Sequence, residues 1–253
     1  MPSISSPVSV ELFPHDSVKE NRFDLLTTPK HAKAVQNQGK VYLVGAGTGD
    51  PELLTIKAYK AILKADVICY DNLVSDEILA INPTAEKIYV GKKCAKHSMP
   101  QQDINDLLVT LAKQGKIVIR LKSGDPFIFG RGGEEMQTVV SAGIACESIA
   151  GITTALAVAN SVNIPLTHRD YAQSVKFVTG FLKTDTPNEQ YAELLADNQT
   201  VIFYMGLNTL PSLTQGLLQA GKSADTPFAI ISNVSRENEQ AVSYTHLRAH
   251  ETV

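Results

Sequence analysis

The sequence predicts an α/β protein with two domains, whose mostly parallel sheets flank a cleft. Short apolar runs typical of strands alternate with helical patterns along most of the 253 residues, and this alternation implies a parallel sheet covered by helices on both faces. Many of the strand-like runs end in turns that contain glycine. The alternation breaks once, near Pro165, and then resumes, and a chain of this length suits two modest domains.

The first domain is expected at residues 39–165, after a mobile leader at 1–38 that is rich in Ser, Pro and Asn. Its strands are expected at 40–44, 65–71, 86–92, 116–122 and 143–150. Apolar residues recur at helical spacing after Pro51, a residue that suits the first turn of a helix. Further helices are expected at 75–80, at 101–115, from about Glu134 and at 151–161.

The second domain is expected at residues 166–240, joined to the first by the segment 163–170. Three apolar runs at 174–180, 200–206 and 227–232 predict strands, with helices between them. In α/β domains ligands bind beyond the carboxyl ends of the strands. The polar and glycine-containing turns that follow these strands are therefore expected to meet in one cleft between the domains.

Composition limits the function. The net charge of −3 argues against a nucleic-acid binder, which would carry a basic face. No apolar run approaches the about 18–20 residues that cross a bilayer, and no secretory signal is evident, so a cytoplasmic protein is expected. Of three cysteines, Cys69 and Cys146 lie in strand-like apolar runs and are interpreted as small core residues. No spacing typical of metal ligands occurs, and no metal is expected.

The stretch Ile119–Glu135 holds the densest chemical signal. A strand-like run is followed by a loop that contains Gly124, Asp125, Pro126 and three further glycines. Arg131 lies between two of these glycines, which makes a surface role unfavourable and the binding of a carboxylate through its planar guanidinium favourable. The loop is expected to let a ligand approach bare backbone.

Other motifs leave alternatives open. The turn GAGTGD fits a dinucleotide-binding pattern poorly, because its third glycine falls on Asp50, and only Asp66 or Asp71 could bind a ribose. A tight strand-to-helix turn needs the same glycines. Asp71 itself follows an apolar strand and could be a helix cap or a general base.

Six further residues have an ordinary structural interpretation. Lys92 ends a strand, where lysines are usually solvated, but it could bind substrate. Met205 would by default fill a core, and Thr153 and Thr154 would by default be hydroxyls at a helix start. His168 and Asp170 could form a linker salt bridge of little energetic weight.

Taken in order, seven motifs resemble the uroporphyrinogen-III C-methyltransferases, within the tetrapyrrole methylase family. They are VYLVGAGTGDPELLTIKA, YDNLVSDEIL, VGKK, IRLKSGDPFIFGRGGEE, GITTALAVANSVNIPLTHRD, FVTGFLK and TVIFYMGL, spread from about Lys40 to Gln240. The resemblance implies two α/β domains flanking a trough, usually in a homodimer. It also implies S-adenosylmethionine as methyl donor and uroporphyrinogen III as acceptor, methylated at C2 and C7 to give precorrin-2 for siroheme or cobalamin.

The resemblance also implies roles for individual residues. Asp71 would accept a proton, Lys92 would donate one, and Arg131 would face the substrate. The methyl donor would be lined by Thr48, Ser123, Gly124, Asp125, Ile128, Thr153, Thr154, Met205 and Val234.

Several positions depart from the family pattern. Thr48 and Ala150 replace prolines, Ser123 replaces a glycine, Phe181 replaces a histidine and Val234 replaces a glycine. The tail at 241–253 resembles neither the strand nor the helix that would end the family fold, so the second domain is expected to be truncated. Three alternatives follow: a methyltransferase for a later precorrin, a catalytically weak S-adenosylmethionine-binding module, and a nicotinamide oxidoreductase.

Overall fold

The computed structural model describes residues 38–91, 99–180 and 191–244. The first lobe contains a five-stranded sheet in the order β3-β2-β4-β1-β5, and every pair of neighbouring strands runs parallel. The strands are β1 (Lys40–Gly45), β2 (Val67–Tyr70), β3 (Glu86–Tyr89), β4 (Ile117–Lys122) and β5 (Ala145–Ile149). All five predicted strands of this lobe are confirmed.

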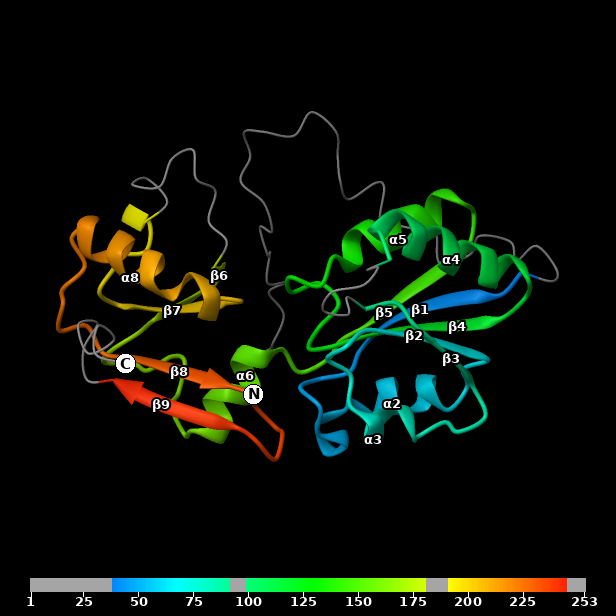
Figure 1. Ribbon diagram of the computed structural model, residues 1–253, viewed down its shortest axis with the longest axis horizontal. Helices are drawn as coiled ribbons and strands as arrows, with labels where there is room; N and C mark the ends of the chain where they lie inside the picture. The colour runs from blue at the N-terminus through cyan, green and yellow to red at the C-terminus, as the bar shows by residue number, and fades with distance from the viewer. Residues whose placement is uncertain (1–37, 92–98, 181–190, 245–253) are drawn as a thin grey trace, which may run out of the picture.

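Helices cover both faces of this sheet (Figure 1). The short α2 (Ile56–Ile62) and α3 (Asp76–Leu79) pack on one face, where Val44, Ile119 and Leu121 are buried. The longer α4 (Gln101–Lys113) and α5 (Gly132–Ser141) pack on the other. Because side chains alternate along a strand, the residues of β4 that point toward α4 and α5 are Val118, Arg120 and Lys122. This alternation places two cations inside the molecule.

Local chemistry explains where the first helices begin. The Asp50 carboxylate accepts a hydrogen bond from the amide of Glu52 and caps the 3₁₀ helix η1 (Pro51–Leu53). Thr55 Oγ1 accepts from the amide of Ala58 and caps α2. Asp50, where a dinucleotide-binding motif would need glycine, is therefore a capping residue.

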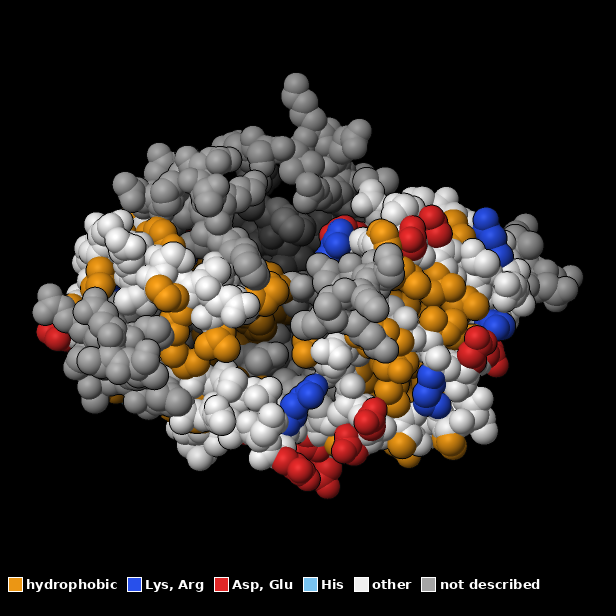
Figure 2. Space-filling view, viewed as in Figure 1, with side chains coloured by type: hydrophobic (Ala, Val, Ile, Leu, Met, Phe, Trp, Pro, Cys, Tyr) orange, Lys and Arg blue, Asp and Glu red, His pale blue; other side chains and the backbone are white. Residues whose placement is uncertain are grey.

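The second lobe is smaller. Strands β6 (Ser174–Thr179) and β7 (Gln199–Tyr204) form a parallel pair, and α8 (Leu210–Gln219) follows the 3₁₀ helix η2 (Leu207–Thr209). Its buried cluster contains Tyr191, Leu194, Leu213 and Leu217. The helix α6 (Thr154–Ser161) leads from the first lobe toward this one, and Figure 2 shows the surface hollowed between the two lobes.

The expectation that the tail after Gln240 does not form a strand is wrong. Residues Gln240–Tyr244 form strand β9, which pairs antiparallel with β8 (Phe228–Ser232). The loop at 233–239 reverses the chain, and Ala241 and Val242 then lie opposite Ile231 and Ile230 of β8. The tail therefore begins with a strand that the sequence pattern did not indicate, and residues 245–253 lie outside the described residues.

Candidate active site

Loops that follow β1, β4 and β5 meet at the carboxyl end of the sheet. Gly124 donates its amide to the Gly47 carbonyl at 2.6 Å, and the Gly47 amide returns a bond to Gly124 at 3.2 Å. Gly124 has a φ of +67°, a left-handed conformation that favours glycine. A Cβ on Gly45 would overlap the backbone of Gly151. The glycines of these turns thus allow three loops to approach one another.

Asp125 holds two of these loops together. Its Oδ1 accepts from the amide of Phe127 at 2.9 Å, and its Oδ2 accepts from the amide of Gly151 at 3.1 Å. The neighbouring Ser123 and Ile128 are half-buried, and the Ser123 hydroxyl makes no hydrogen bond within the described part of the chain. The carboxylate of Asp125 therefore shapes the loop, while the Ser123 hydroxyl remains available.

The β8–β9 loop of the second lobe reaches this site. Ser235 Oγ lies 2.6 Å from the Oγ1 of the buried Thr48, and Arg236 Nη2 donates to the Leu73 carbonyl at 2.7 Å. Val234 is buried beside them. Ser235 has a φ of +62°, which a non-glycine residue rarely adopts. The loop that carries Val234 therefore contacts Thr48 through Ser235.

A tyrosine makes a second bridge between the lobes. The Tyr204 hydroxyl lies 2.7 Å from Thr153 Oγ1 and accepts from the amide of Ala155 at 3.1 Å. Its ring lies against that of Phe129, with centroids 4.9 Å apart. Thr153 is the N-terminal cap residue of α6, but its hydroxyl bonds to Tyr204 and makes no capping bond. Thr154 is half-buried at the first position of α6.

Met205 directly follows Tyr204 and is exposed. Its side chain is part of a residue that is 54% exposed, and its φ is +58°. The interpretation of Met205 as core filler is therefore wrong. A positive φ is uncommon for a residue other than glycine, and contact of the exposed thioether with a ligand stays a prediction.

Asp71 follows β2 and lies at the same carboxyl end of the sheet as the loops after β1, β4 and β5. These loops together form the rim of the candidate site. Its Oδ1 accepts from the amide of Leu73 at 3.2 Å, and its Oδ2 lies 3.7 Å from Arg120 Nη2. Its side chain is 26% exposed. Asp71 is thus partly open to solvent and ordered by a turn on one oxygen and a cation on the other.

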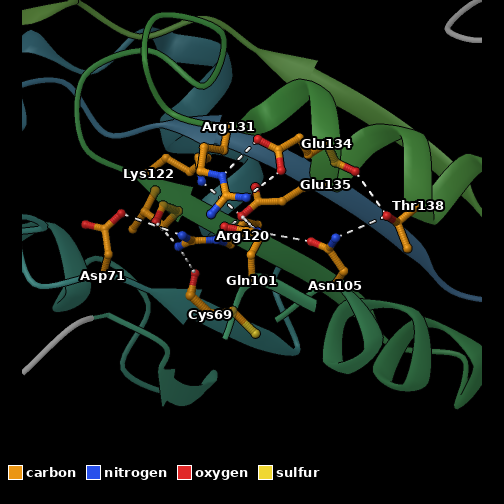
Figure 3. A network of polar contacts seen from close by, with 11 residues as sticks. Cys69, Asp71, Gln101, Asn105, Arg120, Lys122, Arg131, Glu134, Glu135 and Thr138 are labelled. Carbon is orange, nitrogen blue, oxygen red and sulfur yellow. Dashed lines mark hydrogen bonds and ion pairs between the residues drawn. The ribbon is translucent and has the colours of Figure 1, made fainter. Parts of the chain in front are cut away.

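Behind Asp71 lies a buried charge network (Figure 3). Arg120 Nε and Lys122 Nζ lie 3.1 and 3.0 Å from Glu135 Oε1. All three residues are at most 4% exposed. Burial, followed by the nearby Arg120 charge, lowers the pKa of Lys122. This network lies on the face of the sheet that α4 and α5 cover.

Arg131 does not occupy the position that its sequence context predicts. It has a φ of +59° at the start of α5, and its side chain is 55% exposed. Its guanidinium makes a paired interaction with Glu134, with Nε 2.8 Å from Oε1. That hydrogen bond raises the pKa of Arg131 and lowers the pKa of Glu134. The expectation that a surface role is unfavourable for Arg131 is therefore wrong, because the side chain is exposed, while its contact with a ligand stays a prediction.

The remaining expectations divide. Lys92 and Phe181 lie outside the described residues. Cys69 is a buried core residue as predicted, whereas Cys146 is half-buried and packs against the same core cluster. Burial raises the pKa of each thiol to about 12. His168 Nδ1 lies 3.8 Å from an oxygen of Asp170, and both side chains are largely exposed.

The described residues contain neither a metal-binding cluster nor a membrane-spanning helix. In those segments, no cluster of three or more His, Cys, Asp or Glu side chains is arranged to hold a metal ion. No helix there has the length and apolar character that a bilayer crossing needs. A cavity of about 500 Å³ lies between α2 and the sheet, lined by Tyr42, Ile56 and Glu147 among others. It contains none of the predicted site residues.

The sequence reasoning missed Arg120, Lys122, Glu135, Tyr204 and Ser235. A signal existed for the first two, because strands inside a parallel sheet are near-continuous apolar runs and two cations there are anomalous. Glu135 lies where the sequence predicts the start of a helix, a position at which a glutamate is ordinary. Nothing in the local pattern distinguishes Tyr204 or Ser235.

Comparison with known proteins gives a consistent result. The family model described as Tetrapyrrole (Corrin/Porphyrin) Methylases matches residues 40–248. Among curated relatives, the siroheme synthase of Psychrobacter cryohalolentis is 52% identical over 219 residues, which cover 86% of this chain and 42% of the relative. That of Psychrobacter sp. strain PRwf-1 is 55% identical over 208 residues, covering 82% and 43%. This chain therefore spans less than half the length of these relatives.

Solved structures agree on the fold. The native uroporphyrin III C-methyl transferase of Thermus thermophilus is 37% identical, with a TM-score of 0.72 over 85% of this chain and 92% of its own. A structure of the Thermus thermophilus enzyme complexed with S-adenyl homocysteine is 38% identical with the same TM-score and coverage. The predicted α/β fold is thus confirmed, and the chain belongs to the tetrapyrrole methylase family.

Proposed function

We propose that this protein transfers methyl groups from S-adenosylmethionine to C2 and C7 of uroporphyrinogen III, giving precorrin-2. One observation carries the proposal: the residues predicted from separate motifs for the donor and the base lie along one rim of the sheet and the facing loop of the second lobe. The similarity to the Thermus thermophilus methyltransferase supports the acceptor. The similarity to siroheme synthases supports a place in siroheme formation, with cobalamin as the other destination.

The residues at this rim fit a methyl-donor nucleoside. The loop Ser123–Asp125 presents main chain beside a free hydroxyl, and Gly124 has no side chain to block it. Thr154 likewise has a hydroxyl without a partner among the described residues, and Met205 offers an exposed apolar surface. When bound, S-adenosylmethionine supplies a methyl group on a sulfonium, and the electrons of the broken S–C bond stay on sulfur.

The protein then has to align the methyl donor with a ring carbon, orient the acceptor and accept a proton. Loops fixed by Asp125 and by the Thr48–Ser235 contact can hold the donor in line with a ring carbon, and alignment of this kind contributes about 7–11 kcal/mol. Asp71, partly exposed on the same rim, accepts the proton that the ring loses after methylation. Arg131 pairs with a substrate carboxylate in place of Glu134, and Lys92 donates a proton.

Methyl incorporation into uroporphyrinogen III under reducing conditions tests the proposal. Wild type is expected to give a dimethylated product, whereas Asp71→Ala should turn over about a hundredfold more slowly. Arg131→Ala should raise KM for the acceptor and leave kcat nearly unchanged, because an exposed cation contributes uniform binding. Near-equal kcat/KM values for all three proteins would reject these roles.

Two other outcomes have distinct signatures. Absence of a dimethylated product with binding of S-adenosylhomocysteine would favour a methyltransferase for a later precorrin, or a binding module without turnover. The fold similarity to a cobalt precorrin-4 methyltransferase, at 26% identity and a TM-score of 0.72, makes the former the closer rival. We also propose that the protein is cytoplasmic and forms a homodimer. Sedimentation of the purified chain would test the homodimer.

A further inference from the structure

Glu135 is the most buried charge at the site and has an uneven set of partners. It is 0% exposed. Its Oε1 accepts from Arg120 Nε at 3.1 Å, Lys122 Nζ at 3.0 Å and Gln101 Nε2 at 3.2 Å. Its Oε2 is also buried and has no hydrogen-bond partner within the described residues. A buried carboxylate with one unsatisfied oxygen is costly, so its retention calls for a function.

Arg120 is what Glu135 holds in place. The guanidinium uses Nε for Glu135, and it uses Nη1 for the carbonyls of Leu121 at 3.0 Å and Cys69 at 3.4 Å. These bonds fix the plane of the group on two edges. The remaining nitrogen, Nη2, faces Asp71 Oδ2 at 3.7 Å. Figure 3 shows Arg120 extended between Glu135 on one side and Asp71 on the other.

We propose that Glu135 is a positioning residue, which holds Arg120 so that its guanidinium orients the Asp71 carboxylate toward the reacting ring. The reaction itself rests on the proposed function. Glu135 is too deeply buried to touch the substrate, and it acts only through Arg120. Lys122 adds a second positive charge beside Glu135, so that the charges of Arg120, Lys122, Glu135 and Asp71 balance. Burial lowers the pKa of Lys122, because a buried ammonium group is less well stabilised than one in water.

The first test separates positioning from folding. Glu135→Gln is expected to lower kcat by about tenfold to a hundredfold, because small misplacements of a reacting group have effects of this size. Binding of S-adenosylhomocysteine, measured by calorimetry, should change less than about twofold, since the side-chain hydrogen bonds of Glu135 go to Gln101, Arg120 and Lys122 and not to the loops after β1, β4 or β5. The matched control is Glu86→Gln, an exposed glutamate that pairs with Lys116, and it should retain wild-type rates. Unchanged kcat in Glu135→Gln would overturn the proposal.

A second variant asks whether Glu135 merely neutralises Lys122. The double variant Lys122→Met, Glu135→Gln removes one charge of each sign and restores the balance that the single variant lacks. If Glu135 positions Arg120, kcat stays as low as in Glu135→Gln even though thermal stability recovers. Recovery of kcat together with stability would overturn the proposal.

A third comparison asks whether the effect passes through Asp71. Residues that act as a unit have non-additive effects, so Glu135→Gln should cost nothing further in an Asp71→Asn background. If the fold-losses of kcat in the two single variants multiply in the double variant, Glu135 acts independently of Asp71, and the proposal is wrong.

One measurement stays informative if uroporphyrinogen III is not methylated at all, an outcome that would refute the proposed function. A crystal structure of Glu135→Gln is then compared with the wild-type crystal. Separation of Arg120 from Asp71 beyond ion-pair distance supports positioning. An unchanged contact refutes it.

Discussion

Arg120 and Arg131 come from one continuous stretch of sequence, yet only Arg120 is buried. Strand alternation decides the position of Arg120, because its neighbours Ile119 and Leu121 face the opposite helix layer. A positive φ decides the position of Arg131. The glycines on either side of Arg131 suggested a confined arginine, but neighbouring residue types do not reveal which way a left-handed residue directs its side chain.

This contrast gives a stability prediction. Arg120→Met is expected to lower the free energy of unfolding by about 3–5 kcal/mol, because it leaves a buried carboxylate short of a partner. The same substitution at Arg131 breaks only an exposed pair and should cost less than about 1 kcal/mol. Urea unfolding of both variants measures the difference, and equal losses would show that the interior network contributes nothing net.

A second residue-level prediction concerns pH. Glu147 on β5 is bonded by Lys40 at 2.7 Å and by Lys57 at 2.6 Å, and these bonds lower its pKa below the ordinary value of 4.5. A depressed carboxyl pKa stabilises the fold above the unfolded value, and this contribution is lost as pH falls through the folded value.

Glu147→Gln is therefore expected to lower thermal stability slightly at pH 7, by about 0.5 kcal/mol because the side chains are partly exposed. The difference from wild type should shrink as pH falls below 4.5. Melting curves across this range provide the measurement. A difference that grows toward acid pH would contradict the assignment.

At the scale of elements, the glycine turns serve the packing of loops as well as any ligand. A Cβ on Gly151 would overlap the Gly124 carbonyl and the backbone of Gly45. Gly133, in the first turn of α5, has nothing within 4 Å of such a Cβ.

These two glycines form a matched pair for substitution. Gly151→Ala should separate the loops after β4 and β5, destabilise the protein by about 1–3 kcal/mol and weaken S-adenosylhomocysteine binding. Gly133→Ala should be neutral or stabilise by about 0.5–1 kcal/mol, since alanine is the better helix former. Melting curves measure the stability of each variant, and calorimetry measures its binding of S-adenosylhomocysteine. Equal stability and equal affinity of the two variants would show that the close contact of the loops at Gly151 has no effect.

Much of this layer could be predicted from the sequence. Each predicted strand of the first lobe is present, because continuous apolar runs between turn residues have few other solutions in an α/β chain. Strand β9 could not be predicted in this way, because antiparallel pairing at Gln240–Tyr244 depends on β8 lying beside it. The contact of Thr153 with Tyr204 joins residues from different lobes, which no local pattern specifies.

The whole molecule combines two lobes of unequal construction. In the first, β1 and β4 lie centrally in a five-stranded sheet with helices on both faces. In the second, β6–β7 and β8–β9 are two-stranded pairs, and no residue of β6 or β7 is fully buried. The residues of the candidate site come mainly from the first lobe, whereas Met205 and Ser235 come from the second.

Hydrogen exchange should reflect this inequality. Amides of β1 and β4 are expected to exchange slowest, because they open only in global unfolding, and those of β6–β7 and β8–β9 should exchange faster through local opening. Exchange followed by mass spectrometry measures both. Equal protection in the two lobes would mean that they unfold as one cooperative unit.

The uniform direction of the first sheet has a consequence for attachment. The polypeptide enters β1 at Lys40, beside the Gly115–Lys116 turn, whereas Asp71, Gly124 and Gly151 all sit beyond the opposite pole of the strands. Any partner domain spliced ahead of Lys40 would consequently arrive at the far pole. Such an addition could vary in size or be exchanged while the loops beyond the strand ends keep their shape.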